Sequence, residues 1–182
     1  MCWGGMAAES KSTDVAIVPV GDEEAAVTSD QHVFLHPTVM LCVTDHVTRV
    51  KMTEQKGVSH PVTLGLLFGV QKEQDVDIMT SIEVFYAGTP GTTEVLLDKE
   101  YILAQKELIT TVFPSYELLG WYSTSESVEM ELPGLLKIHN QISAYNEDPL
   151  YMHLSSNIVE SQKDLPVHMY RAEFRGTAEE RR

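Results

Sequence analysis

The sequence predicts a single α/β domain in which a mixed β-sheet is flanked by about three α-helices. The chain has 182 residues, which is enough for one domain with a sizeable core but short for two. Segments with apolar residues every three or four positions alternate with apolar runs of strand length. Hydrophobic residues make up 43% of the chain and charged residues 22%, which are ordinary values for a globular protein.

Both ends of the chain lack this periodicity. Residues 1–30 contain scattered glycines and serines and an acidic run at 22–24, so we expect a disordered or loosely held acidic tail there. The folded domain is expected over residues 31–175. The charged segment at 176–182 is expected to be a frayed C-terminus.

The domain is expected to begin with a strand and a helix. After the short strand HVFLHP, Pro37 can occupy the first turn of a helix, where a missing backbone donor costs nothing. Apolar residues at helical spacing continue this helix, which we expect to end before Gly57: Val39, Val43, Val47 and Val50.

Two strands are predicted next. PVTLGLLFGVQ is a nearly continuous apolar run, typical of a strand buried on both faces. Its glycines, Gly65 and Gly69, indicate close approach of another segment. VDIMTSIEVFY alternates between apolar and polar residues, so we expect the apolar residues from Val76 to Tyr86 on one face.

The second half repeats the alternation of strands and helices. EVLLD predicts a short strand, and Asp98 is a plausible N-cap for a helix that runs to about Phe113. The apolar face of this helix is expected at Ile102, Ile109 and Val112. LLGWY predicts a buried strand, and a third helix should begin near Pro133, with Leu135, Ile138, Ile142 and Tyr145 at helical spacing. LYMHLSS and PVHMYRAEF predict two further strands.

Composition excludes several classes of function. The formal net charge of −14 argues against a nucleic-acid surface and favours basic partners. No apolar run approaches the roughly 18 to 20 residues of a membrane span, and no secretory signal is expected. The two cysteines form no disulfide framework or zinc ribbon. We therefore expect a reducing compartment, the cytoplasm or nucleus.

The stretch GWYSTSES places several hydroxyls at the end of a buried strand. Ser123, Ser125 and Ser127 are candidate nucleophiles, but each would need a base, such as His139, within hydrogen-bond reach. No G-x-S-x-G elbow surrounds them. The seven histidines form no H-x-H or H-E-x-x-H metal motif, and no glycine loop is placed to bind phosphate. The residues alone therefore leave the function open.

At GWYSTS the sequence resembles GWYHSHP, the zinc-site strand of the JAMM metalloproteases, which have the MPN fold. LHPTVMLCVTDHVTRVK, PVTLGLLFGVQ and VDIMTSIEVFY resemble, in the same order, the first strand and helix and the following strand pair of MPN domains. The likeness runs from about His32 to Phe174 and implies a curved mixed sheet. DKEYILAQKELITTVFPSYELLGWYSTS, KIHNQI, NEDPLYMHL and QKDLPVHMY resemble the COP9 signalosome branch of the family.

The resemblance also implies what stands at the family's zinc site. Its catalytic glutamate falls at Val62, its two zinc-binding histidines at Ser123 and Ser125, and its aspartate ligand near Leu136. Catalytic zinc needs three protein ligands and a polarised water, and a base must take the proton of that water. The resemblance thus implies a pseudo-metalloprotease with no metal, no cofactor and no catalytic residue, rather than an enzyme.

A member without the site is expected to act as a scaffold. By resemblance it would pair with a catalytic MPN subunit, a zinc isopeptidase, within the COP9 signalosome and support cullin deneddylation. The alternatives are a non-catalytic MPN subunit of the proteasome lid or of translation initiation factor three and, as an enzyme, a zinc-dependent isopeptidase. The isolated chain is also a candidate homodimer. Candidate partner-interface residues are apolar positions on the first two helices: Met40, Leu41, Met52, Leu103 and Leu108. Family members continue into C-terminal helices, which the segment at 176–182 does not resemble.

Overall fold

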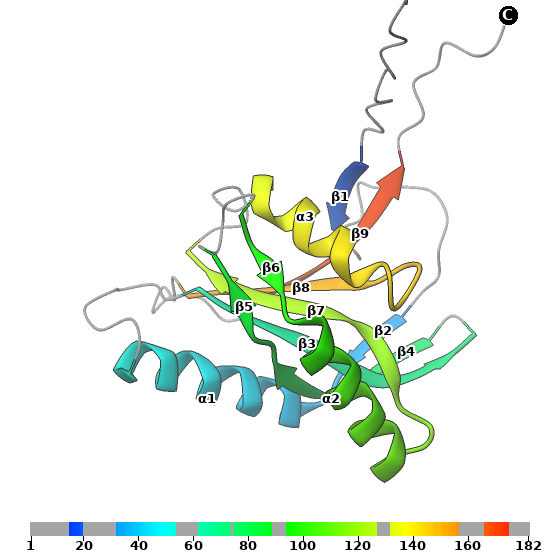
Figure 1. Cartoon of the computed structure of the whole chain (residues 1–182). Helices are drawn as coiled ribbons and strands as arrows, with labels where there is room; N and C mark the ends of the chain where they lie inside the picture. The colour runs from blue at the N-terminus through cyan, green and yellow to red at the C-terminus, as the bar shows by residue number, and fades with distance from the viewer. Residues whose placement is uncertain are drawn as a thin grey trace, which may run out of the picture.

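The computed structural model describes residues 15–19, 32–53, 62–73, 75–88, 94–126, 132–156 and 166–174 (Figure 1). The helices are α1 (Pro37–Thr53), α2 (Lys99–Val112) and α3 (Leu132–Ile142). The strands are β1 (Val15–Pro19), β2 (His32–Leu35), β3 (Thr63–Lys72), β4 (Asp75–Glu83), β5 (Tyr86–Ala87), β6 (Leu96–Leu97), β7 (Glu117–Ser125), β8 (Leu150–Ser155) and β9 (Val167–Phe174).

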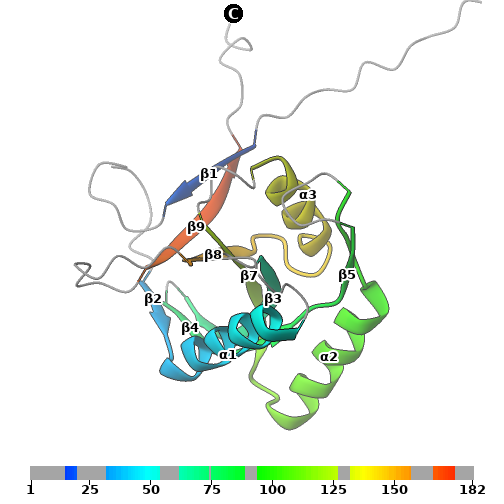
Figure 2. The same ribbon diagram turned by 90° about the vertical axis from the view of Figure 1, so that its left-hand side faces the viewer.

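Seven strands form one mixed sheet in the order β1-β9-β8-β7-β3-β4-β2, and β5 pairs with β6 in a separate ribbon. The pairs β2–β4 and β7–β8 are parallel, and the other pairs in the sheet are antiparallel. Helix α1 lies on one side of the sheet and α3 on the other (Figures 1 and 2). This is the α/β architecture that the sequence predicts, and β7 lies at its centre.

Each face of the sheet has its own hydrophobic cluster. On the face that we call the α1 face, Val39 and Val43 pack on Leu67, Ile78 and Met152. The opposite face, which we call the α3 face, packs against both remaining helices and the β5–β6 ribbon; its cluster includes Leu66, Trp121, Tyr151, Ile102 of α2 and Leu135, Ile138 and Ile142 of α3. Burial on both faces explains the nearly continuous apolar runs of β3 and β7.

The glycines of β3 lie where another segment approaches closely, as the sequence predicts. A Cβ on Gly65 would lie 2.2 Å from Cε1 of Tyr122, and a Cβ on Gly69 would lie 1.9 Å from the carbonyl oxygen of Asp77. Gly65 thereby lets the Tyr122 ring lie close to β3.

The expected helix starts are confirmed. Helix α1 begins at Pro37, and α3 begins at Leu132, one residue before the expected Pro133. Asp98 is the N-cap of α2, and its carboxylate accepts a hydrogen bond of 3.0 Å from the backbone N–H of Tyr101. No helix within the described ranges is both long and apolar enough to cross a bilayer.

Three expectations about local structure were wrong. The strand β1 lies inside the stretch 1–30 that we expected to be loosely ordered; it pairs antiparallel with β9, which supplies the backbone partners that a tail would lack. The rest of that stretch and residues 176–182 lie outside the described residues. The two-residue strand β5 was not foreseen. Val112, expected on the apolar face of α2, is exposed near the C-terminal end of the helix.

The alternation of β4 was also misread. Val76 and Ile78 pack on the α1 face, whereas Ile82 and Val84 pack on the α3 face. The register against β3 shifts between the pairs Phe68–Thr80 and Gly69–Ile78, which inserts one extra residue into β4. Such a bulge moves every later side chain to the other face, and a period of two in the sequence does not reveal it.

Candidate functional site

The stretch GWYSTS forms the C-terminal half of β7, between β3 and β8. Thr63 of β3 pairs with Thr124, and Ser123 pairs with His153 of the parallel strand β8. Because side chains alternate along a strand, Ser123 and Ser125 point to the α3 face with Trp121. Both serines are buried.

Each serine is hydrogen bonded to a large polar side chain on β8. The Oγ of Ser123 lies 2.8 Å from the hydroxyl oxygen of Tyr151, and the Oγ of Ser125 lies 2.9 Å from Nε2 of His153. Both partners lie on the same face of β8. Each stands two residues before the β8 residue that pairs directly with its serine. The hydroxyl cluster is thus part of a closed layer of buried polar contacts, which satisfies groups that would be costly to bury alone.

Aromatic rings continue this layer toward the middle of the sheet. The rings of Trp121 and Tyr151 stack with centroids 4.4 Å apart, and Tyr170 of β9 stacks on Tyr151 at 5.6 Å. The indole Nε1–H of Trp121 donates to Nδ1 of His139 on α3 over 3.4 Å. Burial lowers the pKa of His139, with Asp148 acting in the opposite direction, so this histidine is held as a neutral acceptor. Helix α3 is thereby fixed over the layer.

His153 is the most strongly perturbed group of the layer. Burial, with a smaller contribution from His168, lowers the pKa of His153 to about 4. Its Nδ1 has no hydrogen-bond partner in the described part of the chain, and the residue is 1% exposed. The histidine is therefore neutral near pH 7 and serves Ser125 through one nitrogen only.

The Ser125–His153 contact has the distance of a nucleophile and its base, but lacks the rest of such a site. A catalytic histidine is usually oriented by a third group on its other nitrogen, and no described residue fills that place on His153. Both side chains are also buried, so a substrate has no access to them. Of the other expected nucleophile and base, Ser127 lies outside the described residues, and the imidazole of His139 accepts a hydrogen bond from Trp121. We interpret the pair as packing.

The four positions that resemblance assigns to a zinc site lie around this layer. Val62 directly precedes β3, where strand alternation places it beside Ser125, and Leu136 is half-buried on α3 over the same face. Neutral hydroxyls and aliphatic side chains are not the thiolate, imidazole or carboxylate donors that zinc takes, so these residues do not fit the ion. Within the described ranges no three His, Cys, Asp or Glu side chains are grouped to hold a metal.

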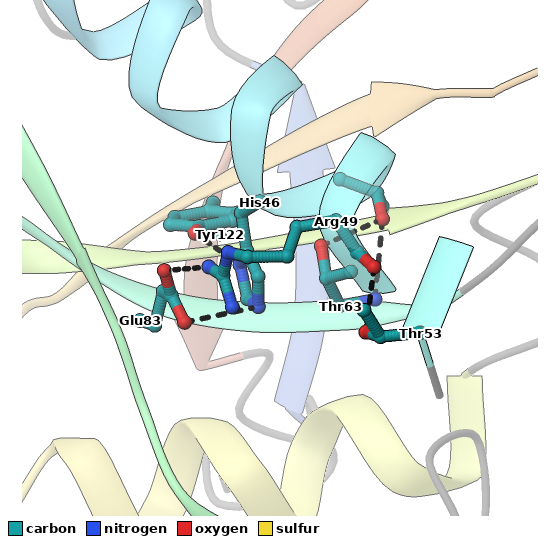
Figure 3. Close-up of polar contacts among 7 residues, drawn as sticks. His46, Arg49, Thr53, Thr63, Glu83 and Tyr122 are labelled. Carbon is teal, nitrogen blue, oxygen red and sulfur yellow. Dashed lines mark hydrogen bonds and ion pairs between the residues drawn. The ribbon is translucent and has the colours of Figure 1, made fainter. Parts of the chain in front are cut away.

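The opposite, α1 face of β7 carries a second polar network, drawn in Figure 3. The hydroxyl oxygen of Tyr122 lies 2.8 Å from Nδ1 of His46 on α1, and Nε2 of His46 lies 3.7 Å from Oε2 of Glu83 on β4. Arg49, one turn after His46, forms an ion pair with Glu83. Burial, then the negative charge of Glu83, raises the pKa of Tyr122, so its hydroxyl keeps its proton. The network holds α1 on the sheet.

Four of the five candidate interface residues lie on the surface. Leu41 is 71% exposed and Met52 68% exposed on α1, while Leu103 is 54% and Leu108 56% exposed on α2. Met40 is half-buried and packs against the core of the α1 face. An apolar groove of about 970 Å³ opens beside α1, and Met40, Leu41 and Met52 line it together with Leu35 and Leu154. The surface positions therefore do not serve the domain's own core.

Sequence reasoning missed the partners of the serines and the role of His46. The sequence places Tyr151 and His153 only within an apolar strand. Their cross-strand neighbours depend on the strand register, which cannot be derived from the sequence. His46 carried a usable signal. It lies seven residues after Val39 and four before Val50, on the buried stripe of α1, whereas the expected Val47 is only half-buried.

The chain matches one known protein family and several known proteins. Residues 28–148 match the family described as JAB1/Mov34/MPN/PAD-1 ubiquitin protease. The chain belongs to this family. It is 38% identical over 152 residues to COP9 signalosome complex subunit 6 of Dictyostelium discoideum, covering 84% of this chain and 46% of that protein. The rice protein of the same name is 35% identical, with 88% and 50% covered, and the Drosophila melanogaster protein 30%, with 92% and 47% covered. The chain spans about half the length of these relatives.

Proposed function

We propose that this chain is a non-catalytic MPN-domain scaffold subunit of the COP9 signalosome. The observation that carries the proposal is the closed layer on β7, where Ser123 and Ser125 are buried and hydrogen bonded to Tyr151 and His153. By resemblance these serines stand at zinc-binding positions of the family, and neutral hydroxyls are not donors that zinc takes. The relatives named as signalosome subunit 6 support the choice of host complex.

The scaffold role rests on surfaces outside the sheet. We infer that the chain pairs with the catalytic zinc isopeptidase, COP9 signalosome subunit 5, and so supports cullin deneddylation in the cytoplasm and nucleus. Two sets of exposed apolar residues support pairing: those that line the groove beside α1, and Leu103, Leu108 and Val112 around α2 with Phe113 just beyond. Exposed apolar residues grouped on a helix are typical of protein–protein interfaces.

Affinity purification of the tagged chain from its native cells tests the host complex. Signalosome subunits and cullins are expected in the purified material. Recovery of only proteasome-lid subunits, or only initiation-factor-three subunits, would contradict the assignment and favour one of those two complexes.

Metal analysis of the purified chain tests the absence of catalysis. We expect substoichiometric zinc that does not change in a Ser125→Ala variant. About one zinc per chain, lost in that variant, would instead indicate a functional metal site.

A further inference from the structure

A polar pocket of about 340 Å³ lies between α1, the second half of β4 and the first turn of α2. We call it the α1–β4 pocket; Asp45, Ser81, Glu83, Tyr101 and Tyr122 line it. β2 pairs with β4 only from Asp75 to Ile78, so the later half of β4 is not covered by that strand. The pocket is separate from the closed layer, because none of its lining residues belongs to that layer.

Ser81 places a buried hydroxyl without a described partner on the wall of the pocket. The residue is only 8% exposed, and its Oγ has no hydrogen-bond partner within the described residues. Native proteins rarely bury a hydroxyl without a partner, since the lost hydrogen bonds to water are not replaced. A ligand group in the pocket would supply the missing partner.

Tyr122 presents a second acceptor. The proximity of His46 Nε2 to the Glu83 carboxylate favours the tautomer that carries its proton on Nε2, so Nδ1 accepts the hydrogen bond from the Tyr122 hydroxyl. The lone pairs of the Tyr122 oxygen then remain available to a donor. Figure 3 shows this arrangement of Tyr122, His46 and Glu83.

The charge of the pocket is negative. Asp45 lies exposed on α1, and Glu83 is about 40% exposed, with its ion pair to Arg49 as a partial counter-charge. Among the described residues that line the pocket, none is a Lys, Arg or His. Burial, then the negative charge of Glu83, raises the pKa of Tyr101 on the α2 side of the pocket. The complementary ligand is a cation with several hydrogen-bond donors.

We propose that the α1–β4 pocket binds the primary ammonium group of a lysine side chain. An ammonium is a compact charge with three donors, which match the Ser81 hydroxyl, the Tyr122 oxygen and a carboxylate of Asp45 or Glu83. The volume of about 340 Å³ exceeds the roughly 30 Å³ share of one water, so the end of an alkyl chain also fits.

The lysine belongs to a protein that lies across α1 and α2, and this source rests on the proposed pairing. Figure 2 shows α1 and α2 on neighbouring parts of the molecular surface, with the sheet behind them. A partner that covers the exposed Leu103 on α2 and reaches α1 would cover the pocket between them. A free alkylamine has the same chemistry, and the experiment below distinguishes the two sources.

The first arm of the test uses the full chain alone. Amide resonances of Cys42 and Ser81 are followed by NMR during titration with n-butylammonium chloride, with n-butanol as a neutral probe and CaCl2 as a metal probe. Saturable shifts are expected with butylammonium only, and Ser81→Ala should weaken binding about fivefold, the effect of one hydrogen bond. Asp75→Asn, on the same strand but outside the pocket, is the control. Equal shifts with butanol, shifts with calcium alone, or unchanged binding by Ser81→Ala would overturn the proposal.

The second arm measures pairing with the catalytic MPN subunit. Asp45→Asn and Ser81→Ala are each expected to weaken the pair about fivefold, whereas Asp75→Asn leaves it unchanged. If the wild-type chain pairs and neither variant weakens the pair, a lysine of the partner is not the source of the ammonium group. A free amine would then be the remaining ligand. Absence of wild-type pairing would overturn the proposed function and this source together, while the first arm still decides whether the pocket binds an ammonium.

Discussion

The α3 face of β7 and the outer surfaces of α1 and α2 use their side chains in opposite ways. On β7, Ser123 and Ser125 are polar yet buried, and each has a large partner on β8. On the helices, Leu41 and Leu103 are apolar yet exposed, at 71% and 54%. Polar groups that are buried and bonded stabilise a fold, whereas apolar groups left in water are available to another protein. The buried serines of β7 thus stabilise the sheet, whereas the exposed leucines of α1 and α2 can contact a partner.

The largest effect is expected when histidines replace the two buried serines of β7. The double substitution Ser123→His and Ser125→His is expected to lower the free energy of unfolding by about 3–5 kcal/mol, because overpacking costs about 1–3 kcal/mol per site and two hydrogen bonds are lost. Urea denaturation measures the loss. Ser115→His, at an exposed position, is the control.

A zinc titration of the same double variant sharpens the result. No stoichiometric binding is expected, because Leu136 and Val62 supply neither the third ligand nor the base. A variant as stable as wild type that binds one zinc would mean that the layer is an open, usable site.

The pH dependence of stability tests whether the buried histidines are neutral. The pKa of His153 is about 4 in the folded chain and about 6.5 when unfolded, so the unfolded state binds more protons between these values. The stabilisation is therefore complete above about pH 6.5 and is lost as pH falls toward 4, by up to roughly 3 kcal/mol. His139 shifts in the same direction and adds to the effect.

Denaturation of wild type and His153→Gln at pH 7, 6, 5 and 4.5 checks this dependence. In the variant, the free energy of unfolding should change with pH less steeply than in wild type. The difference in slope should be up to about 1.4 kcal/mol per pH unit, which is the contribution of one bound proton. His32→Gln, at an exposed position, controls for the loss of a surface histidine. Equal slopes for His153→Gln and wild type would show that His153 is not the buried neutral group described here.

Removal of one hydroxyl tests a single bond of the layer. Ser125→Ala is expected to lower the free energy of unfolding by about 1–2 kcal/mol, because Nε2 of His153 loses the Ser125 hydroxyl while remaining buried. Thermal and urea denaturation beside Ser115→Ala measure the difference. A loss no larger than in the control would indicate that water replaces the hydroxyl and that the layer is less closed than its geometry implies.

The parts of the fold that the sequence predicts well are those governed by local rules. Pro37 and Asp98 mark helix starts through their own backbone and side-chain chemistry, and Gly65 marks a close approach. The parts that it misses depend on pairing between distant segments. The bulge in β4 reverses the facing of Ile82 relative to Ile78, and the serine partners follow from the β7–β8 register. Neither is encoded within a window of neighbouring residues.

The candidate site shows the same division. The resemblance at GWYSTS implies that Val62, Ser123 and Ser125 stand where the family has a base and zinc ligands, and the sequence alone supports that expectation. What fills the place instead, a tyrosine and a histidine from β8, needed the register. The α1–β4 pocket is more remote still, since Asp45, Ser81 and Tyr101 come from three elements that only the fold brings together.

Substitutions on the outer surfaces of α1 and α2 are expected to affect stability least and partner binding most. Leu41→Ser with Met52→Ser on α1, and separately Leu103→Ser with Leu108→Ser on α2, should each change the free energy of unfolding by less than about 0.5 kcal/mol per residue, because all four side chains lie largely in water. Pairing with the catalytic MPN subunit, measured by calorimetry, should weaken about tenfold or more for the pair that lies in the interface. Lys99→Ser on α2 is the matched control for a lost surface side chain. A tenfold loss in only one double variant assigns the interface to that helix. Unchanged pairing in both variants would mean that the partner does not bind these exposed apolar residues, and that the contrast with β7 does not locate the function.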